Sequence, residues 1–386
     1  MSNFKINEIV EAMPPSGIRK FFDMVLEMKD VVSLGVGEPD FVTPWHICES
    51  AIYSIEQGYT SYTSNYGMMK LREKIAEYIY KKSLVVYNPA NEVLITVGVS
   101  QGLDIAMRAL LNQGDEVIVI EPSYVSYKPM VLLAGGTPVV MPTYFDDDFQ
   151  INLDTLEALI TPKTKGILIN YPANPTGVTY DRELLTKFSK IAIKHDLIVF
   201  SDEVYSELTY DQEHVSINSL EGMRERTVHL SGFSKAWAMT GWRMGYIAAP
   251  KYFVDPIVKV HQYSMLCAPI AAQMASIEAL DHGEEAVHKM VEEYNQRRRT
   301  IVKGLNEIGL KCKMPQGAFY AFPSVKDLPI DAEEFCLRLL KEHSVAVVPG
   351  GGFGESGIPH IRCSYASSFN NIEIALERMA KFMKTI

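Results

Sequence analysis

The chain has 386 residues, of which 47% are hydrophobic and 22% are charged, a composition typical of folded globular proteins and not of disordered ones. Its 37 basic and 47 acidic residues give a formal net charge of −10, which disfavours general binding to nucleic-acid phosphates. Five scattered cysteines without a C-x-x-C pair support neither a disulfide framework nor a zinc site, and the sequence shows no secretory h-region and no membrane-spanning apolar run. We therefore expect a compact cytoplasmic protein that binds no membrane.

Short apolar runs alternate with segments of helical spacing over the first half of the chain. Strands alternating with helices in this way predict βαβ units and a mostly parallel sheet covered on both faces. The expected strands are 92–97, 116–120, 139–140, 166–170 and 197–200, and the expected helices are 98–111, 127–134, 153–160 and 183–195.

The C-terminal part of the chain has a different pattern. A charged helix is predicted over 285–304, and a helix over 333–341 lies between two predicted strands, 311–322 and 345–348. This pattern indicates a second, smaller α/β domain. We expect an N-terminal arm with part of the small domain over 1–33, a large domain over 34–284 and a small C-terminal domain over 285–386.

Polar loops follow four of the predicted strands of the large sheet. They read GVSQG, EPSY, YPANPTG and SDEVY. Because ligands of open α/β sheets bind beyond the carboxyl ends of the strands, four such loops in one sheet predict a binding site there.

The strongest local signal is Ser231–Gly245, SGFSKAWAMTGWRMG, in which a lysine follows a flexible turn and an arginine lies eight positions further on. A lone lysine in such a loop is usually a surface residue, and it is a nucleophile toward carbonyls only in a partly desolvated pocket. This run resembles the cofactor-lysine signature of the class I and II aminotransferases, fold-type I enzymes that use pyridoxal 5′-phosphate. Further matches occur in the expected order over essentially the whole chain: LGVGEPDF (34–41), SYTSNYGMMKLRE (61–73), NYPANPTG (170–177), SDEVYSELTY (201–210), GAFYAFP (317–323) and HIRCSYASS (360–368).

The resemblance assigns the cofactor ring to residues around the ends of the predicted strands. It implies that Lys235 holds the cofactor and moves protons as general base and acid, while Asp202 keeps the pyridine nitrogen protonated so that the ring accepts electrons. By itself, Asp202 reads equally well as a helix N-cap. Asn174 and Tyr205 match the donors to the ring 3′ oxygen, and Tyr124 matches the stacking position. Together the implied catalytic residues are Lys235, Asp202 and Tyr205, and Glu203 stays unassigned.

The resemblance also implies a phosphate site at the start of the predicted helix over 98–111. Backbone N–H groups of Val99, Ser100 and Gln101 lie where a helix N-terminus receives an anion, although a serine there is also an ordinary N-cap. Ser234 and Arg243 supply a hydroxyl and a cation. Residue 232 is glycine where some relatives carry a phosphate-binding serine, so Ser231 or Ser234 is the substitute. Tyr62 matches a tyrosine that reaches the phosphate of the neighbouring subunit, which implies a homodimer with shared sites.

The substrate carboxylate is the remaining partner. Arg362 matches the arginine that binds it bidentately, although a lone arginine that ends a strand is usually solvent-exposed. Gly37, Tyr124 and Asn174 complete the implied substrate-binding set, and the N-terminal segment 16–21 is expected to fold over the side-chain pocket.

These residues together predict an aminotransferase that moves the α-amino group of aspartate, alanine or an aromatic amino acid to a 2-oxo acid such as 2-oxoglutarate by a ping-pong mechanism. The pattern is most similar to bacterial aspartate, alanine and aromatic aminotransferases. The alternative on the same fold is a carbon–sulfur β-lyase or a decarboxylating synthase. A transcription regulator with an aminotransferase-like body is disfavoured because only 33 residues precede LGVGEPDF, and a non-catalytic protein has no need of the whole set.

Overall fold

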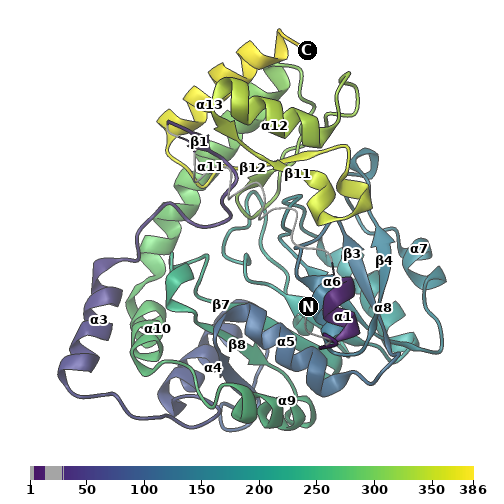
Figure 1. Cartoon of the computed structure of the whole chain (residues 1–386). Helices are drawn as coiled ribbons and strands as arrows, with labels where there is room; N and C mark the ends of the chain where they lie inside the picture. The colour runs from purple at the N-terminus through teal and green to yellow at the C-terminus, as the bar shows by residue number, and fades with distance from the viewer. Residues whose placement is uncertain (1–3, 14–27, 29) are drawn as a thin grey trace.

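A seven-stranded sheet forms the centre of the larger part of the molecule (Figure 1). The computed structural model describes residues 4–13, 28 and 30–386. β8 is antiparallel to both of its neighbours and every other adjacent pair is parallel, which confirms the predicted mostly parallel sheet. In spatial order the strands are β2 (Val93–Thr96), β8 (Gly245–Ala248), β7 (Thr227–Gly232), β6 (Ile198–Asp202), β5 (Thr164–Asn170), β3 (Glu116–Glu121) and β4 (Thr137–Pro142).

Helices cover both faces of this sheet because successive side chains along its strands point in opposite directions. Ile167 and Val199 pack in one apolar cluster with α7 (Leu153–Ala158) and α8 (Arg182–Lys194), whereas Leu168 and Phe200 pack in another with α5 (Gly98–Leu110), α6 (Tyr127–Leu133) and α9 (Lys251–Ser264). The first face also carries α3 (Trp45–Glu56), α4 (Met69–Ser83) and α10 (Ile270–His282). Alternate residues of β6 therefore belong to two different cores.

A smaller α/β unit packs above the carboxyl ends of these strands (Figure 1). It contains the three-stranded antiparallel sheet β11-β12-β9 and the parallel pair β1-β10. Its elements are β1 (Val32–Ser33), α11 (Glu284–Glu307), β9 (Tyr320–Ala321), α12 (Ala332–His343), β10 (Val345–Ala346), β11 (Val348–Pro349), β12 (Ile361–Ser364) and α13 (Phe369–Met383), and the short helix α1 (Glu8–Ala12) precedes them all along the chain.

Two predicted strands differ from the structure. Only Tyr320–Ala321 of the segment 311–322 is a strand, because Cys312 N–H bonds the Asn306 side chain and Gly317 N–H bonds Gly177 in a loop of the large unit. The segment 345–348 is two short strands, since its first half pairs with β1 and its second half with β12. β7 and β8, which flank the lysine run, were not predicted, because both strands are short.

None of the helices in the described parts of the chain is long and apolar enough to cross a bilayer.

Candidate active site

A cavity of about 440 Å³ lies where the carboxyl ends of β5, β6 and β7 meet the smaller unit. The parallel strands bring residues that are distant in sequence to one edge of the sheet, as the polar loops predicted. Of the predicted residues, the cavity is lined by Gly37, Val99, Ser100, Tyr124, Asn174, Asp202, Tyr205, Ser234, Lys235, Arg243 and Arg362.

Lys235 presents its amine inside the cavity from the turn that follows β7. Its Nζ donates to the Gly37 carbonyl oxygen at 2.7 Å, and it lies 5.7 Å from the ring centroid of Tyr205 and 5.6 Å from that of Phe319. Burial lowers the pKa of Lys235 to about 8, Glu38 opposes this shift and Arg362 adds to it. The pKa of this amine is therefore close to neutral pH, so the amine can both accept and release a proton. An ordinary surface lysine has a much higher pKa.

Asp202 is the last residue of β6, and its carboxylate faces the cavity. Its Oδ2 accepts a hydrogen bond from the Tyr127 hydroxyl at 2.7 Å, and its Oδ1 accepts one from Val204 N–H at 3.2 Å. The residues after it form a turn and no helix, so Asp202 is not a helix N-cap. Burial raises the pKa of Asp202 to about 6, and the hydrogen bonds from Tyr127 and Val204 hold that rise down.

Arg362 is buried on β12, with only 4% of its surface exposed, and is not a solvent-exposed strand end. Its Nη1 donates to Asn174 Oδ1 at 2.9 Å, its Nη2 donates to the Gly35 carbonyl oxygen at 2.7 Å, and its guanidinium lies 4.6 Å from the Tyr320 ring centroid. Its Nε is buried and contacts no hydrogen-bonding atom of the described residues. The guanidinium is thus held in place from two sides while part of its donor set faces the cavity.

The start of α5 and Arg243 form a second positively charged end of the cavity. Gly98 has φ +77°, and a Cβ on it would lie 2.6 Å from Arg243 Nη2, so glycine lets the guanidinium approach the first turn of the helix. Val99 and Ser100 line the cavity there, and the helix has no side-chain cap. A helix N-terminus beside a guanidinium is suited to an anion.

The structure also shows which serine can replace the missing one at Gly232, and where Gln101 lies. A Cβ at Gly232 would lie 2.8 Å from the Met244 carbonyl oxygen, so a serine does not fit there. Ser234 lines the cavity, whereas the Ser231 hydroxyl donates to the Glu203 carbonyl oxygen at 3.3 Å on the other side. The Gln101 side chain accepts from Val97 N–H at 2.7 Å and lies 2.9 Å from His261 Nδ1, which leaves only its backbone for an anion.

Two tyrosines at the site were missed by the sequence analysis. Tyr320 lines the cavity with its hydroxyl 2.7 Å from that of Tyr205, and Tyr127 bonds Asp202. Each lay within a segment that was recognised, since Tyr320 belongs to GAFYAFP and Tyr127 follows Tyr124 by three positions at a helix start. Neither received a role, because nothing in the local pattern shows where a buried hydroxyl points.

Two expectations lie outside this cavity. Tyr62 is 83% exposed and does not line the cavity. The segment 16–21 lies outside the described residues.

Comparisons with known proteins agree on one family. The profile of the family "Aminotransferase class I and II" matches residues 29–379. The chain belongs to the class I and II aminotransferases. It is 44% identical over 382 residues to the aspartate aminotransferase of Pyrococcus abyssi and 42% identical over 382 residues to the aromatic-amino-acid aminotransferase 2 of Thermococcus litoralis, with 98% of each chain covered in both cases. The structure of the aspartate aminotransferase of Thermus thermophilus with maleate matches with a TM-score of 0.93 at 38% identity, covering 98% of this chain and 99% of that one.

These findings confirm the predicted fold type, enzyme class and cofactor, because class I and II aminotransferases use pyridoxal phosphate. The residues of this aminotransferase fit that group. The cavity holds an amine in Lys235, a buried carboxylate in Asp202, and a glycine-opened helix start beside Arg243, which are the chemical partners of an aldehyde, a pyridine nitrogen and a phosphate.

Proposed function

We propose that this aminotransferase transfers the α-amino group of aspartate, alanine or an aromatic amino acid to 2-oxoglutarate in two successive half-reactions. The observation that carries the proposal is the single cavity in which Lys235, Asp202 and Arg362 converge. Similarity to both an aspartate and an aromatic-amino-acid aminotransferase supports a donor range that spans these side chains. The expected parts of the chain, 1–33, 34–284 and 285–386, remain our proposed domain division.

In this proposal, pyridoxal phosphate supplies the electron sink that stabilises the charge released when the substrate Cα–H bond breaks. Lys235 Nζ would hold the cofactor and, when free, would take the proton from the substrate Cα and deliver it to the cofactor carbon C4′, a role suited to an amine with a pKa of about 8. The Asp202 carboxylate, held by Tyr127, would keep a proton on the ring nitrogen. Tyr205 and Asn174 would donate to the ring oxygen, and the Tyr124 ring would stack on the cofactor.

The cofactor phosphate and the substrate α-carboxylate bind at opposite ends of the cavity in this proposal. The start of α5 with Val99, Ser100 and Gln101 backbone groups, together with Ser234 and Arg243, receives the phosphate. Arg362 binds the substrate α-carboxylate through its guanidinium, and Gly37 N–H assists. Because donor and acceptor carry the same α-carboxylate, Arg362 serves both half-reactions, and Arg362→Lys is expected to rescue little of the loss since the planar fork is gone.

We also propose a homodimer in which Tyr62 reaches the phosphate of the partner subunit. The Asn65 side chain donates to the Leu266 carbonyl oxygen at 2.9 Å, so the segment that carries Tyr62 lies beside the end of α9. Tyr263 there is 88% exposed and Tyr62 is 83% exposed, and exposed apolar patches mark protein–protein contacts. Mixing Lys235→Ala with Tyr62→Phe subunits should restore activity, because one site of the heterodimer carries neither change. A fully active monomer in sedimentation experiments would contradict the shared site.

The donor is tested by measuring kcat/KM for a panel of amino acids against 2-oxoglutarate. We expect aspartate, alanine and phenylalanine to be used, with glutamate formed in each case. Borohydride reduction followed by peptide mapping should place the cofactor on Lys235, and an adduct on another lysine would refute that assignment. Release of pyruvate and ammonia from cystathionine without any acceptor acid would instead indicate the carbon–sulfur β-lyase.

A further inference from the structure

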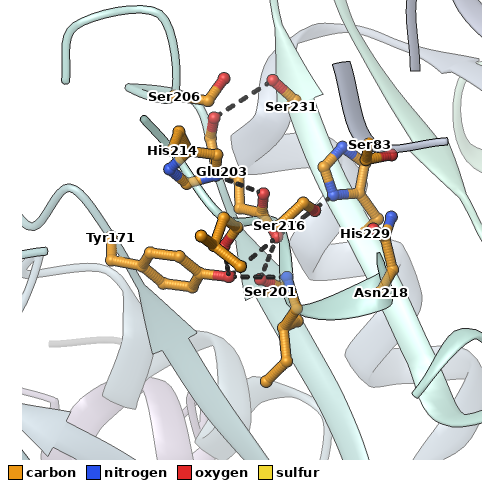
Figure 2. Close-up of polar contacts among 12 residues, drawn as sticks. Ser83, Tyr171, Ser201, Glu203, Ser206, His214, Ser216, Asn218, His229 and Ser231 are labelled. Atoms are coloured by element: carbon orange, nitrogen blue, oxygen red, sulfur yellow. Dashed lines mark hydrogen bonds and ion pairs between the residues drawn. The ribbon is translucent and has the colours of Figure 1, made fainter. Parts of the chain in front are cut away.

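Glu203 follows Asp202 directly but points to the opposite face of the sheet, and its carboxylate is clamped there (Figure 2). Its Oε1 accepts from the Ser201 hydroxyl at 2.7 Å and the Tyr171 hydroxyl at 3.4 Å, and its Oε2 accepts from His214 Nε2 at 2.7 Å. His229 Nδ1 lies 3.4 Å from Oε1 as an ion-pair partner. Only 1% of Glu203 is exposed, so these contacts take the place of solvent.

The main chain of Glu203 is held as firmly as its side chain. Its N–H donates to the Leu230 carbonyl oxygen at 2.9 Å on β7. Its carbonyl oxygen accepts from Ser206 N–H at 3.0 Å and from the Ser231 hydroxyl at 3.3 Å. The residue therefore ties the end of β6 to β7 and to the turn that carries Tyr205, which are the two elements that present the cofactor-facing side chains.

The groups around the Glu203 carboxylate come from four parts of the large unit. Ser201 is on β6, His229 is on β7, Tyr171 follows β5, and His214 comes from the loop before β7 and stacks on the Tyr171 ring at a centroid distance of 5.1 Å. A second cavity, of about 420 Å³, opens next to this cluster from the face that carries α4. Its other charged or titratable groups are Tyr78, Lys81, Lys82, Glu207, Glu213 and Tyr246, of which Lys82 pairs with Glu207 at 2.8 Å and Lys81 with Glu284 at 2.9 Å.

We propose that Glu203, clamped by His214 and His229, is a positioning residue for the transamination reaction: it fixes the end of β6 and sets the electrostatic field behind the Asp202 carboxylate. This inference rests on the proposed role of Asp202. Glu203 does not line the cavity that contains Lys235 and Asp202, so it acts through its neighbour.

The charges of the cluster act on Asp202 in opposite directions. Burial alone would raise the pKa of Glu203, but His229 and His214 more than offset it and lower the pKa below its ordinary value, so the carboxylate is ionised at neutral pH. The negative charge of Glu203 contributes to the raised pKa of Asp202, and His229 counteracts it. Removing Glu203 should thus lower the pKa of Asp202, and removing His229 should raise it. A mere loss of packing would not give shifts of opposite sign.

The experiment titrates Asp202 in the full-length protein, prepared without cofactor and labelled with ¹³C at the aspartate carboxyl carbon, with Asp202→Asn identifying the resonance. Glu203→Gln should lower the pKa of Asp202 by roughly half a unit or more, and His229→Gln should raise it by a similar amount. In the holoenzyme the acid limb of the kcat/KM profile should move in the same two directions. If Glu203→Gln does not fold, the rise with His229→Gln carries the test alone.

The matched control is Glu207→Gln, which removes another carboxylate that lines the same second cavity. Glu207 is paired with Lys82 and is not among the groups that shift the pKa of Asp202. This change should therefore leave the pKa of Asp202 unaltered. Shifts of the same sign in the Glu203 and His229 variants, or no shift in either, would overturn the proposal. Failure of the proposed function would give a different result, because the Asp202→Asn protein would then keep its pyridoxal phosphate affinity and its rate. The Asp202 titrations in the Glu203 and His229 variants would still test the proposal for Glu203.

Discussion

Asp202 and Glu203 are adjacent carboxylates on one strand end, and both are almost fully buried, yet their environments are opposite. Asp202 has two hydrogen-bond donors and its pKa is raised to about 6, whereas Glu203 has two imidazoles and two hydroxyls around it and its pKa is lowered. The alternation of side chains along β6 places one carboxylate in the cavity that contains Lys235 and the other among imidazoles and hydroxyls on the far face. In our proposals, the first carboxylate belongs to the reactive site and the second holds the strand end in place.

The largest effect is expected for Glu203→Ala. Removing one partner of a buried charge cluster leaves His214 and His229 without their carboxylate, which typically costs about 3–5 kcal/mol of unfolding free energy. Urea unfolding of the variant measures this. Glu207→Gln is the control and should lose far less, because its carboxylate pairs with the partly exposed Lys82. A variant as stable as the wild type would mean that the cluster is not an anchor.

Asp202→Ala is expected to affect the reaction more than the fold. The loss of one preorganised electrostatic partner typically lowers kcat by roughly 10²–10³, about 3–4 kcal/mol. Single-turnover rates with aspartate measure the loss, and the unfolding free energy should not fall as it does in Glu203→Ala. If the rate stays within about fivefold of wild type, Asp202 does not protonate the ring nitrogen.

Tyr127→Phe removes a single hydrogen bond, the one that Asp202 accepts from the Tyr127 hydroxyl. The hydroxyl lowers the pKa of Asp202, so its removal should raise that pKa further, by roughly a unit, since a hydrogen bond to a charged group contributes about 1.5–3 kcal/mol. We expect about twofold slower turnover at about pH 7, a loss that approaches about tenfold below about pH 6, and recovery at higher pH. Tyr180→Phe, which removes the hydroxyl of another buried tyrosine, is the control in the same pH profile.

The smallest effect concerns stability against pH in the cofactor-free protein. The pKa of Asp202 is higher in the folded state than its ordinary value, so the folded state binds this proton more tightly and loses stability as pH rises toward about 6 and past it. Relative to Asp202→Asn, the wild type should lose about 1 kcal/mol between about pH 5 and about pH 7. For Glu203 the sign is opposite, because its lowered pKa stabilises the folded state above its ordinary value and that contribution is lost only in more acidic solution. Between about pH 5 and about pH 7, Glu203→Gln should therefore lose less stability than the wild type, and only because its Asp202 pKa is lower. If the unfolding free energies of Asp202→Asn and Glu203→Gln differed from that of the wild type by the same amount at every pH, the comparison would be contradicted.

Much of this molecule could be predicted from its sequence. The runs 116–120, 166–170 and 197–200 are strands in the structure, and the loops after them meet at one cavity because parallel strands end at the same edge. Periodicity is local information, so it places strands and helices without knowledge of their partners. Lys235, Asp202, Arg243 and Arg362 were instead assigned from motifs that resemble those of the class I and II aminotransferases, and the structure brings them to one cavity.

Tertiary structure alone decided what each buried polar atom contacts. The fold brings the Tyr127 and Tyr320 hydroxyls to Asp202 and Tyr205, which their local sequence does not show. The backbone of segment 311–322, which was predicted to be a strand, bonds loops instead over most of its length. Glu203 was left unassigned for the same reason, because its partners His214 and His229 lie 11 and 26 residues away in sequence and on other elements. Hydrogen bonds and pKa shifts depend on neighbours that only the packed chain supplies, whereas the pattern of apolar residues is written along the chain itself.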